Sequence, residues 1–344
     1  MHERSGPAVL EVSDLTKVYG GRPPMKAVDG LSFDLRQGEA LGLLGPNGAG
    51  KTTTIQMLLS TLTPTSGEIA YFGRSLRGHR DFILSRVGYA SAYAKLPTHL
   101  TILENLDVFG RLSDMGRADR AARSRELLTR FGVWELRDRI MTGLSAGQTT
   151  RVMLAKAFLA RPRVVLLDEP TASLDPDIAH EVRTFVTERR DREGVSLLYT
   201  SHDMDEVAMI CDRVLFLDRG RLAAIGPPAE LAASAAATKV RLRAADAASA
   251  AIIREEARAG GLSARPIEPH ADAPDEVEIE MDEPRVAPFL AALARRDASY
   301  SEIHLDKPTL EDYFLKIARR SGTDRLTTEA QRTQRRGEEK TETQ

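Results

Sequence analysis

"GPNGAGKTT", residues 45–53, is the stretch that decides the fold, because it joins the apolar run at 40–44 to a helix-compatible run that starts at Lys51. In this strand-to-helix setting the pattern G-x-x-x-x-G-K-T predicts a phosphate-binding loop. Glycines let backbone amides approach phosphate closely, and the following helix adds its positive N-terminal end. We expect the Lys51 side chain to bridge the β- and γ-phosphates of ATP, and the Thr52 hydroxyl to bind Mg²⁺. The residues expected to contact ATP are Gly45, Pro46, Asn47, Gly48, Ala49, Gly50, Lys51, Thr52 and Thr53. A glycine turn with an exposed lysine is the alternative.

Two adjacent acids follow another apolar run, VVLLDEP at 164–170. Hydrolysis of a metal-bound triphosphate needs a carboxylate for the metal and a group that activates water. We expect Asp168 to hold Mg²⁺, directly or through water, and Glu169 to be the general base. Two surface acids at the end of a strand are the alternative, and the lysine loop at 45–53 argues against it.

His202 lies just beyond a third apolar run, in LLYTSHDMDE at 197–206. A histidine at a strand end is often structural. Since this one follows another strand of the predicted sheet, we expect it to reach the γ-phosphate and to orient Glu169 and water.

A second anion site is predicted at LSAGQTTRV, residues 144–152, where small polar residues precede a basic, helix-compatible run. Five motifs then follow one another along the chain: the loop at 45–53, this second site, the Asp168–Glu169 pair, the SLDP segment at 173–176 and His202. Over roughly residues 9–226 the chain therefore resembles the ATPase subunits of ATP-binding-cassette (ABC) transporters, in which a Leu-Ser-Gly-Gly-Gln-like signature takes this place.

The resemblance implies a role for two anion sites in one chain. In that family two ATPase subunits pack head to tail, and the signature helix of one covers the γ-phosphate held by the other. It follows by resemblance that Ser145, Gly147 and Gln148 act on the ATP of the partner and that Asp175 lies at the dimer interface. Tyr19 matches the aromatic that stacks on adenine, with an unspecialised strand-end tyrosine as the alternative.

The chain departs from the family pattern at two positions. Ala146 replaces the first signature glycine, which is tolerable if this residue avoids positive φ. Ala92 stands where the family has the glutamine that joins the metal site to the transmembrane partner. Because alanine cannot bind a metal, our hypothesis is that water fills the missing position and that Ser91 or Tyr93 takes over part of the coupling.

The pattern of apolar residues predicts an α/β fold in which strands alternate with helices. The resemblance implies that residues 9–231 form an ABC ATPase domain. Residues 97–145 are expected to form a helical insert, in which Ile102, Leu106 and Phe109 pack internally. A small accessory α/β domain is expected at 238–320. The segments 1–8 and 321–344 are expected to be a flexible N-terminus and a disordered tail.

Composition limits the setting of the protein. The 344 residues carry a formal net charge of −2, so nucleic acid is not an expected partner. The only cysteine, Cys211, lies in an apolar context and is expected to be a packing residue. There is neither an apolar run long enough to span a bilayer nor the apolar core of a signal peptide. We therefore expect a cytoplasmic ATPase that reaches the membrane through another protein.

The C-terminal domain and its PTLEDYFLKIARR ending at 308–320 resemble those of bacterial drug and polysaccharide exporters whose permease is a separate chain. The resemblance implies a homodimer that drives such a permease from the cytoplasmic face of the membrane, with docking around residues 93–99. The ending is also consistent with an appendage that only stabilises the dimer. Two competing functions are a soluble ABC ATPase of DNA repair or translation, with no permease, and a module that holds ATP without turnover.

Overall fold

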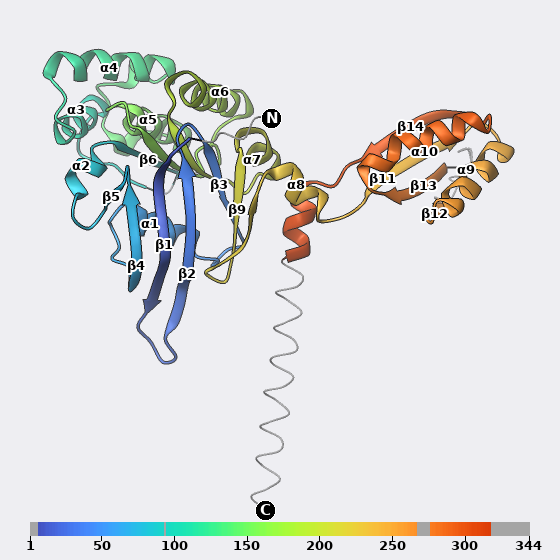
Figure 1. Cartoon of the computed structure of the whole chain (residues 1–344). Helices are drawn as coiled ribbons and strands as arrows, with labels where there is room; N and C mark the ends of the chain where they lie inside the picture. Colours follow the sequence, from blue (N-terminus) through green and yellow to red (C-terminus); the bar gives the residue numbers. More distant parts are fainter. Residues whose placement is uncertain (1–5, 93, 267–275, 318–344) are drawn as a thin grey trace, which may run out of the picture. The chain divides into compact units, whose positions relative to one another are not determined.

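The computed structural model describes residues 6–92, 94–266 and 276–317. The chain divides into two compact units, Met1–Pro228 and Ala229–Gln344, which are described separately (Figure 1). The expected tail at 321–344 and most of the expected flexible N-terminus lie outside the described residues. The first strand already begins at Ala8.

The first unit is built on a six-stranded sheet in the order β10-β9-β3-β8-β7-β6. All neighbouring strands are parallel except the pair β9 and β10. Every residue of β3, β7 and β8 is buried, which explains why the sequences of these strands are mostly apolar. The polar exceptions are Asp168 at the end of β7 and Ser196 and Thr200 at the two ends of β8. The strands are β3 (Ala40–Leu44), β6 (Val87–Ser91), β7 (Val164–Asp168), β8 (Ser196–Thr200), β9 (Arg213–Asp218) and β10 (Arg221–Gly226).

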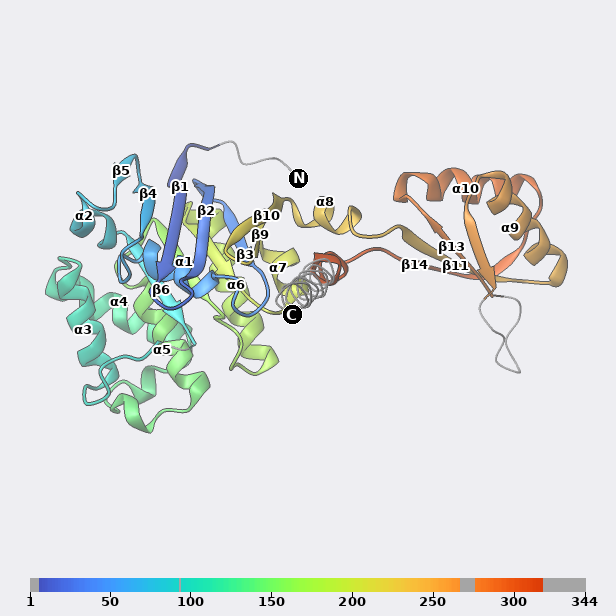
Figure 2. The ribbon, with the colours of Figure 1, turned by 90° about the horizontal axis from the view of Figure 1, so that it is seen from below.

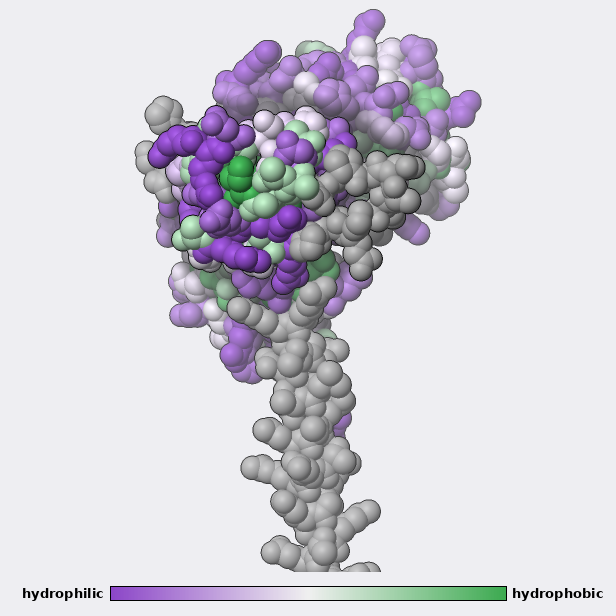
Figure 3. Space-filling model, turned by 90° about the vertical axis from the view of Figure 1, so that its right-hand side faces the viewer, coloured by the Kyte–Doolittle hydropathy of each residue, from purple (hydrophilic) through white to green (hydrophobic). Residues whose placement is uncertain are grey.

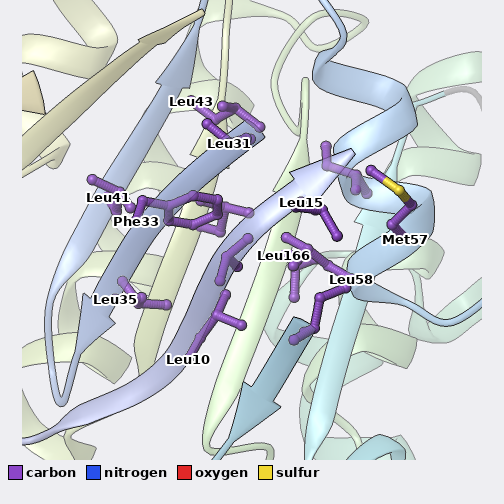
Figure 4. Close-up of a cluster of buried hydrophobic side chains, with 14 of the residues drawn as sticks. Leu10, Leu15, Leu31, Phe33, Leu35, Leu41, Leu43, Met57, Leu58 and Leu166 are labelled. Carbon is purple, nitrogen blue, oxygen red and sulfur yellow. The ribbon is translucent and has the colours of Figure 1, made fainter. Parts of the chain in front are cut away.

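A second, antiparallel sheet in the order β2-β1-β4-β5 packs on the first unit's main core. Its strands are β1 (Ala8–Tyr19), β2 (Met25–Arg36), β4 (Ser66–Tyr71) and β5 (Arg74–Ser75). Figure 4 shows the core between the two sheets, where Leu10, Leu31 and Phe33 face Leu41 and Leu166. Met57 and Leu58 of α1 (Lys51–Leu58) belong to the same core, so the helix that follows the phosphate loop is anchored at its far end.

Helices cover the main sheet, and α3, α4 and α5 pack against one another (Figure 2). The first two lie in the predicted helical insert, and α5 follows it. In α3 (Ile102–Leu112) a capping box joins Thr101 to Glu104, and Ile102 and Leu106 are fully buried. Phe109 is half-buried. The other helical segments of this unit are α2 (Arg80–Leu84), α4 (Arg117–Arg130), the 3-10 turns Trp134–Leu136 and Met141–Gly143, α5 (Ala146–Phe158), α6 (Pro176–Glu193) and α7 (Met204–Ile210).

The second unit is a four-stranded antiparallel sheet in the order β12-β13-β11-β14, with α9 and α10 side by side on one face (Figure 2). Alternate residues of β11 and β13 are buried against these helices. A capping box joins Thr309 and Asp312 at the start of the helical residues 310–317, as their spacing predicts. The elements are α8 (Pro228–Ala233), β11 (Thr238–Ala244), α9 (Ala247–Ala259), β12 (Ser263–Pro266), β13 (Glu276–Met281), α10 (Glu283–Arg295) and β14 (Tyr300–Asp306).

These elements confirm the mixed α/β fold with a parallel-containing sheet. Cys211 is buried, and burial raises the pKa of its thiol, as expected for a packing residue. Over the part of the chain that the structure describes, no helix has both the length and the apolar character needed to cross a bilayer. The surface visible in Figure 3 is mostly hydrophilic, with a few small hydrophobic areas between the polar side chains.

Candidate nucleotide-binding site

Three loops leave the same edge of the main sheet and bring the predicted site residues together. Strands β3, β8 and β7 are parallel neighbours, so their carboxyl ends lie next to one another. The loop at 45–50 follows β3, Glu169 follows β7, and Ser201 and His202 follow β8. The crevice outside the carboxyl ends of parallel strands is where open α/β sheets bind ligands.

The phosphate loop has a shape that only glycine permits at two of its positions. Gly45 and Gly50 have φ values of 148° and 105°. A Cβ on Gly45 would lie 2.3 Å from the Leu217 carbonyl oxygen, and one on Gly50 would lie 2.4 Å from that of Ala27. Because no side chains cover these positions, the backbone amides of the loop are open to an anion such as a nucleotide phosphate.

Lys51, at the start of α1, is held over this loop. Its Nζ donates to the Gly45 carbonyl oxygen at 2.5 Å and to that of Pro46 at 3.3 Å. Burial lowers the pKa of the lysine, while Glu169 and Asp168 nearby oppose that shift. A partly desolvated cation beside polar carbonyls is placed to bind phosphate oxygens.

Asp168 ends β7 as a buried carboxylate with a hydroxyl on each oxygen. Thr200 Oγ1 donates to Oδ1 at 2.8 Å, and Ser91 Oγ donates to Oδ2 at 3.1 Å. These two hydroxyls come from the strands on either side, β8 and β6. The carboxylate direction is therefore fixed before any metal binds.

Glu169 turns the chain away from the sheet. Its φ of 54° lies in the left-handed region that favours glycine, and its amide donates to the Thr200 carbonyl oxygen at 3.1 Å. Its Oε2 lies 2.7 Å from Nδ1 of His202, whose side chain is 74% exposed. An unusual backbone conformation thus aims the carboxylate towards the histidine.

A cavity of about 1370 Å³ joins these groups. The predicted residues that line it are Tyr19, Asn47, Gly48, Ala49, Gly50, Lys51, Thr52, Thr53, Asp168 and Glu169. Gly45 and Pro46 do not line the cavity, but their carbonyl oxygens accept hydrogen bonds from Lys51, which does. His202 does not line it either, but it is hydrogen-bonded to Glu169, which does. Ser145, Gly147, Gln148 and Asp175 are not among its lining residues.

The donor set fits Mg²⁺. The Thr52 and Asp168 side chains line one cavity and offer hard oxygen ligands, which this ion prefers. Among the described residues, no three or more His, Cys, Asp or Glu side chains form a group able to hold a metal. Mg²⁺ bound with one or two protein ligands and substrate phosphates matches such a site.

The signature segment begins α5. Ser145 is its N-cap: its Oγ accepts from the Gln148 amide at 3.2 Å, and Gln148 Oε1 accepts from the Ser145 amide at 3.0 Å. Ala146 is the first helical residue and has no positive φ, so its methyl group is accommodated. A Cβ on Gly147 would lie 3.2 Å from the Ser173 carbonyl oxygen, so this helix end passes close to the SLDP segment.

Ala92, which the resemblance places at the position of the glutamine, donates its amide to the Asp168 carbonyl oxygen at 3.3 Å. Ser91 is the polar side chain that contacts Asp168 from this strand. Tyr93, the other residue expected to contribute, lies outside the described residues.

Two groups at the site were not predicted from the sequence. The Thr200 hydroxyl donates to the Asp168 carboxylate and accepts from the Glu169 amide, so it contacts both acidic residues. In the sequence, the only indication of this role is a hydroxyl residue at the end of a buried strand. Lys156 lines the cavity with its Nζ 5.6 Å from the Tyr89 ring centroid and 5.3 Å from that of Phe109. The spacing of apolar residues does not indicate that Lys156 lines the cavity, because its position there depends on how α5 packs on β6.

Comparison with known proteins adds sequence and structural relatives. The family model described as "ABC transporter" matches residues 28–172. The daunorubicin/doxorubicin resistance ATP-binding protein DrrA of Streptomyces peucetius is 35% identical over 93% of this chain and 96% of that protein. The Nod factor export ATP-binding protein I of Rhizobium meliloti (strain 1021) is 32% identical over 92% of this chain and 89% of that protein. A solved structure, "Structure of ATP binding subunit of ABC transporter", matches with a TM-score of 0.61 at 27% identity, over 65% of this chain and 91% of that chain.

Proposed function

Since the chain belongs to the ABC transporter family as an ATP-binding ATPase, we propose that it is the energy-supplying subunit of an exporter. Two copies close around two ATP molecules and drive a separate transmembrane permease from the cytoplasmic face of the membrane. The drug-resistance and Nod factor export proteins to which the chain is similar support export.

One observation carries the proposal of a dimer. The cavity contains the phosphate loop, Asp168 and Glu169 of the chain, whereas Ser145 and Gly147 do not line it. Ser145 is nevertheless exposed at the start of a 13-residue helix, which is suited to an anion. A second copy in head-to-tail contact brings such a helix to the open side of each cavity.

Each residue has a chemical role in this proposal. The amides of 45–51 and Lys51 bind the phosphates, and Tyr19 stacks on adenine. Thr52 and Asp168 hold Mg²⁺, which neutralises charge on the phosphates when bound. Glu169 takes the proton of the attacking water, and His202, hydrogen-bonded to its Oε2, keeps that carboxylate in place. Ser145, Gly147 and Gln148 act on the partner's ATP, with Asp175 at the interface.

We propose that Ser91 takes part in the coupling that the family assigns to glutamine, because its hydroxyl contacts the carboxylate proposed to bind the metal. Water then fills the ligand position that Ala92 leaves. The adjoining segment 94–99 is the proposed docking surface for the permease.

ATP hydrolysis by the purified chain tests the proposal. Glu169→Gln keeps the shape of the side chain but removes the base, so hydrolysis is expected to fall roughly 100- to 10,000-fold. Glu181→Gln, an exposed carboxylate on α6, is the matched control and should hydrolyse ATP normally. With Mg²⁺ and ATP, Glu169→Gln should accumulate as a dimer by light scattering. Equal hydrolysis in the two variants would overturn the assignment of Glu169.

A further inference from the structure

Glu206 is a buried carboxylate beside the site, with only 3% of the residue exposed. It lies on α7, directly after the loop that carries His202. Burial of a carboxylate is unfavourable unless hydrogen bonds or an opposite charge compensate for the lost hydration. The contacts that compensate for the burial of Glu206 therefore show which parts of the chain this residue holds together.

Both hydrogen bonds of Glu206 Oε2 come from loops of the catalytic site. Thr171 Oγ1 donates to it at 2.9 Å, and Ser201 Oγ donates to it at 2.8 Å. Thr171 is two residues after Glu169, and Ser201 directly precedes His202. One oxygen atom thus joins the loop of the general base to the loop of the histidine.

Two further contacts fix this joint. Arg183 Nη1 of α6 lies 3.7 Å from Glu206 Oε1, so the carboxylate faces a positive charge. The Asp203 amide donates to Ser201 Oγ at 3.1 Å, which orients that hydroxyl. The carboxylate is therefore attached to α6 as well as to the two loops.

The geometry that depends on this joint is the pair of Glu169 and His202, whose Oε2 and Nδ1 atoms lie 2.7 Å apart. Packing does not hold the histidine side chain, because 74% of it is exposed. Glu169 also has a left-handed backbone, which persists only when its surroundings hold it. The pairing of β7 with β8 and the hydrogen bond from the Glu169 amide to Thr200 already hold the starts of the two loops together. The two side chains meet only if the segments beyond these residues also keep a fixed separation.

We propose that Glu206 is a positioning residue for hydrolysis: by joining Thr171 to Ser201, its buried carboxylate holds Glu169 and His202 at hydrogen-bonding distance. This inference rests on the proposed function. Glu206 is not among the residues that line the cavity, so we expect its loss to leave nucleotide binding by the phosphate loop and Tyr19 unchanged. The turnover number kcat should therefore fall while KM for ATP stays constant.

Steady-state ATP hydrolysis by the full chain tests the proposal with three variants. Thr171→Val removes one hydroxyl with little change in shape, and kcat should fall roughly 10- to 100-fold with KM within about twofold, since small displacements of catalytic groups have effects of this size. Glu206→Ala should lose at least as much. Glu206→Gln keeps an oxygen that can accept both hydroxyls, so it should restore most of the kcat lost in Glu206→Ala.

The matched control is Thr187→Val, which removes a half-buried hydroxyl that donates to the Arg183 carbonyl oxygen within α6. Its kcat should equal that of the wild type. A normal kcat in Thr171→Val, or a raised KM with kcat unchanged, would overturn the role of Glu206. If Glu206→Ala does not fold, Thr171→Val decides. Failure of the proposed function looks different: the wild type would not hydrolyse ATP, or Glu169→Gln would match it.

Discussion

Replacing Lys156 by methionine should stabilise the first unit at pH 7. The lysine is half-buried on α5 between the rings of Tyr89 and Phe109, and burial lowers its pKa from 10.5 to about 8. Since one pKa unit corresponds to about 1.4 kcal/mol, the full shift amounts to about 3 kcal/mol. The side chain keeps some contact with water, so we expect about 1–2 kcal/mol of gain from Lys156→Met.

The pH dependence gives the sign of the effect. Below pH 8 the lysine is charged in both the folded and the unfolded chain, so its burial penalty is fully present. Between pH 8 and about 10.5 the unfolded chain binds more protons, so wild-type stability rises with pH relative to the variant. The advantage of Lys156→Met should therefore be constant below pH 8 and shrink as the pH rises towards 10.5.

Urea unfolding between pH 7 and pH 10 measures this difference. The single tryptophan, Trp134, lies in the first unit, so its fluorescence reports the unfolding of that unit. Lys95→Met, which replaces an exposed lysine of the first unit, is the matched control and should change stability little at any pH. A gain for Lys156→Met that is the same at pH 7 and pH 10 would refute the reasoning, as would a loss at pH 7.

Three further predictions follow from the backbone and from the metal site. Gly50→Ala should abolish ATP binding, measured by calorimetry, because its Cβ would lie 2.4 Å from the Ala27 carbonyl oxygen and its φ is positive; tight binding would contradict the loop geometry. Gly88→Ala should lower the free energy of unfolding by about 1–3 kcal/mol, because its Cβ would lie 2.2 Å from the Ala157 carbonyl oxygen of α5. Ala92→Gln, measured as ATP hydrolysis with the permease bound, should change activity little, because water fills the missing ligand position and Ser91 takes over part of the coupling; a large stimulation would show that the native site is impaired.

The sequence predicts the fold well where the residues alone determine the outcome. The mostly apolar runs at 40–44, 164–168 and 196–200 form central parallel strands, because burial on both faces favours apolar residues along most of each strand. The capping spacing of Thr309 and Asp312 is likewise local and was confirmed.

The site is predictable from the sequence only in part. Motifs indicate Lys51, Glu169 and His202, but Thr200, Lys156 and Glu206 have roles that arise from neighbouring strands and helices. The joint between Thr171 and Ser201 connects segments 30 residues apart through one carboxylate, and nothing in the local pattern around Glu206 indicates it.

The central claim is that each ATP is held by two copies of the chain. Mixing Lys51→Ala with Ser145→Arg tests it, because each variant alone loses both sites of its dimer, whereas a mixed dimer keeps one complete site. If subunits exchange freely, an equal mixture has about half mixed dimers, so hydrolysis should return to about a quarter of the wild-type rate on the subunit arrangement proposed here. A mixture no more active than the average of the two separate variants would contradict the shared site.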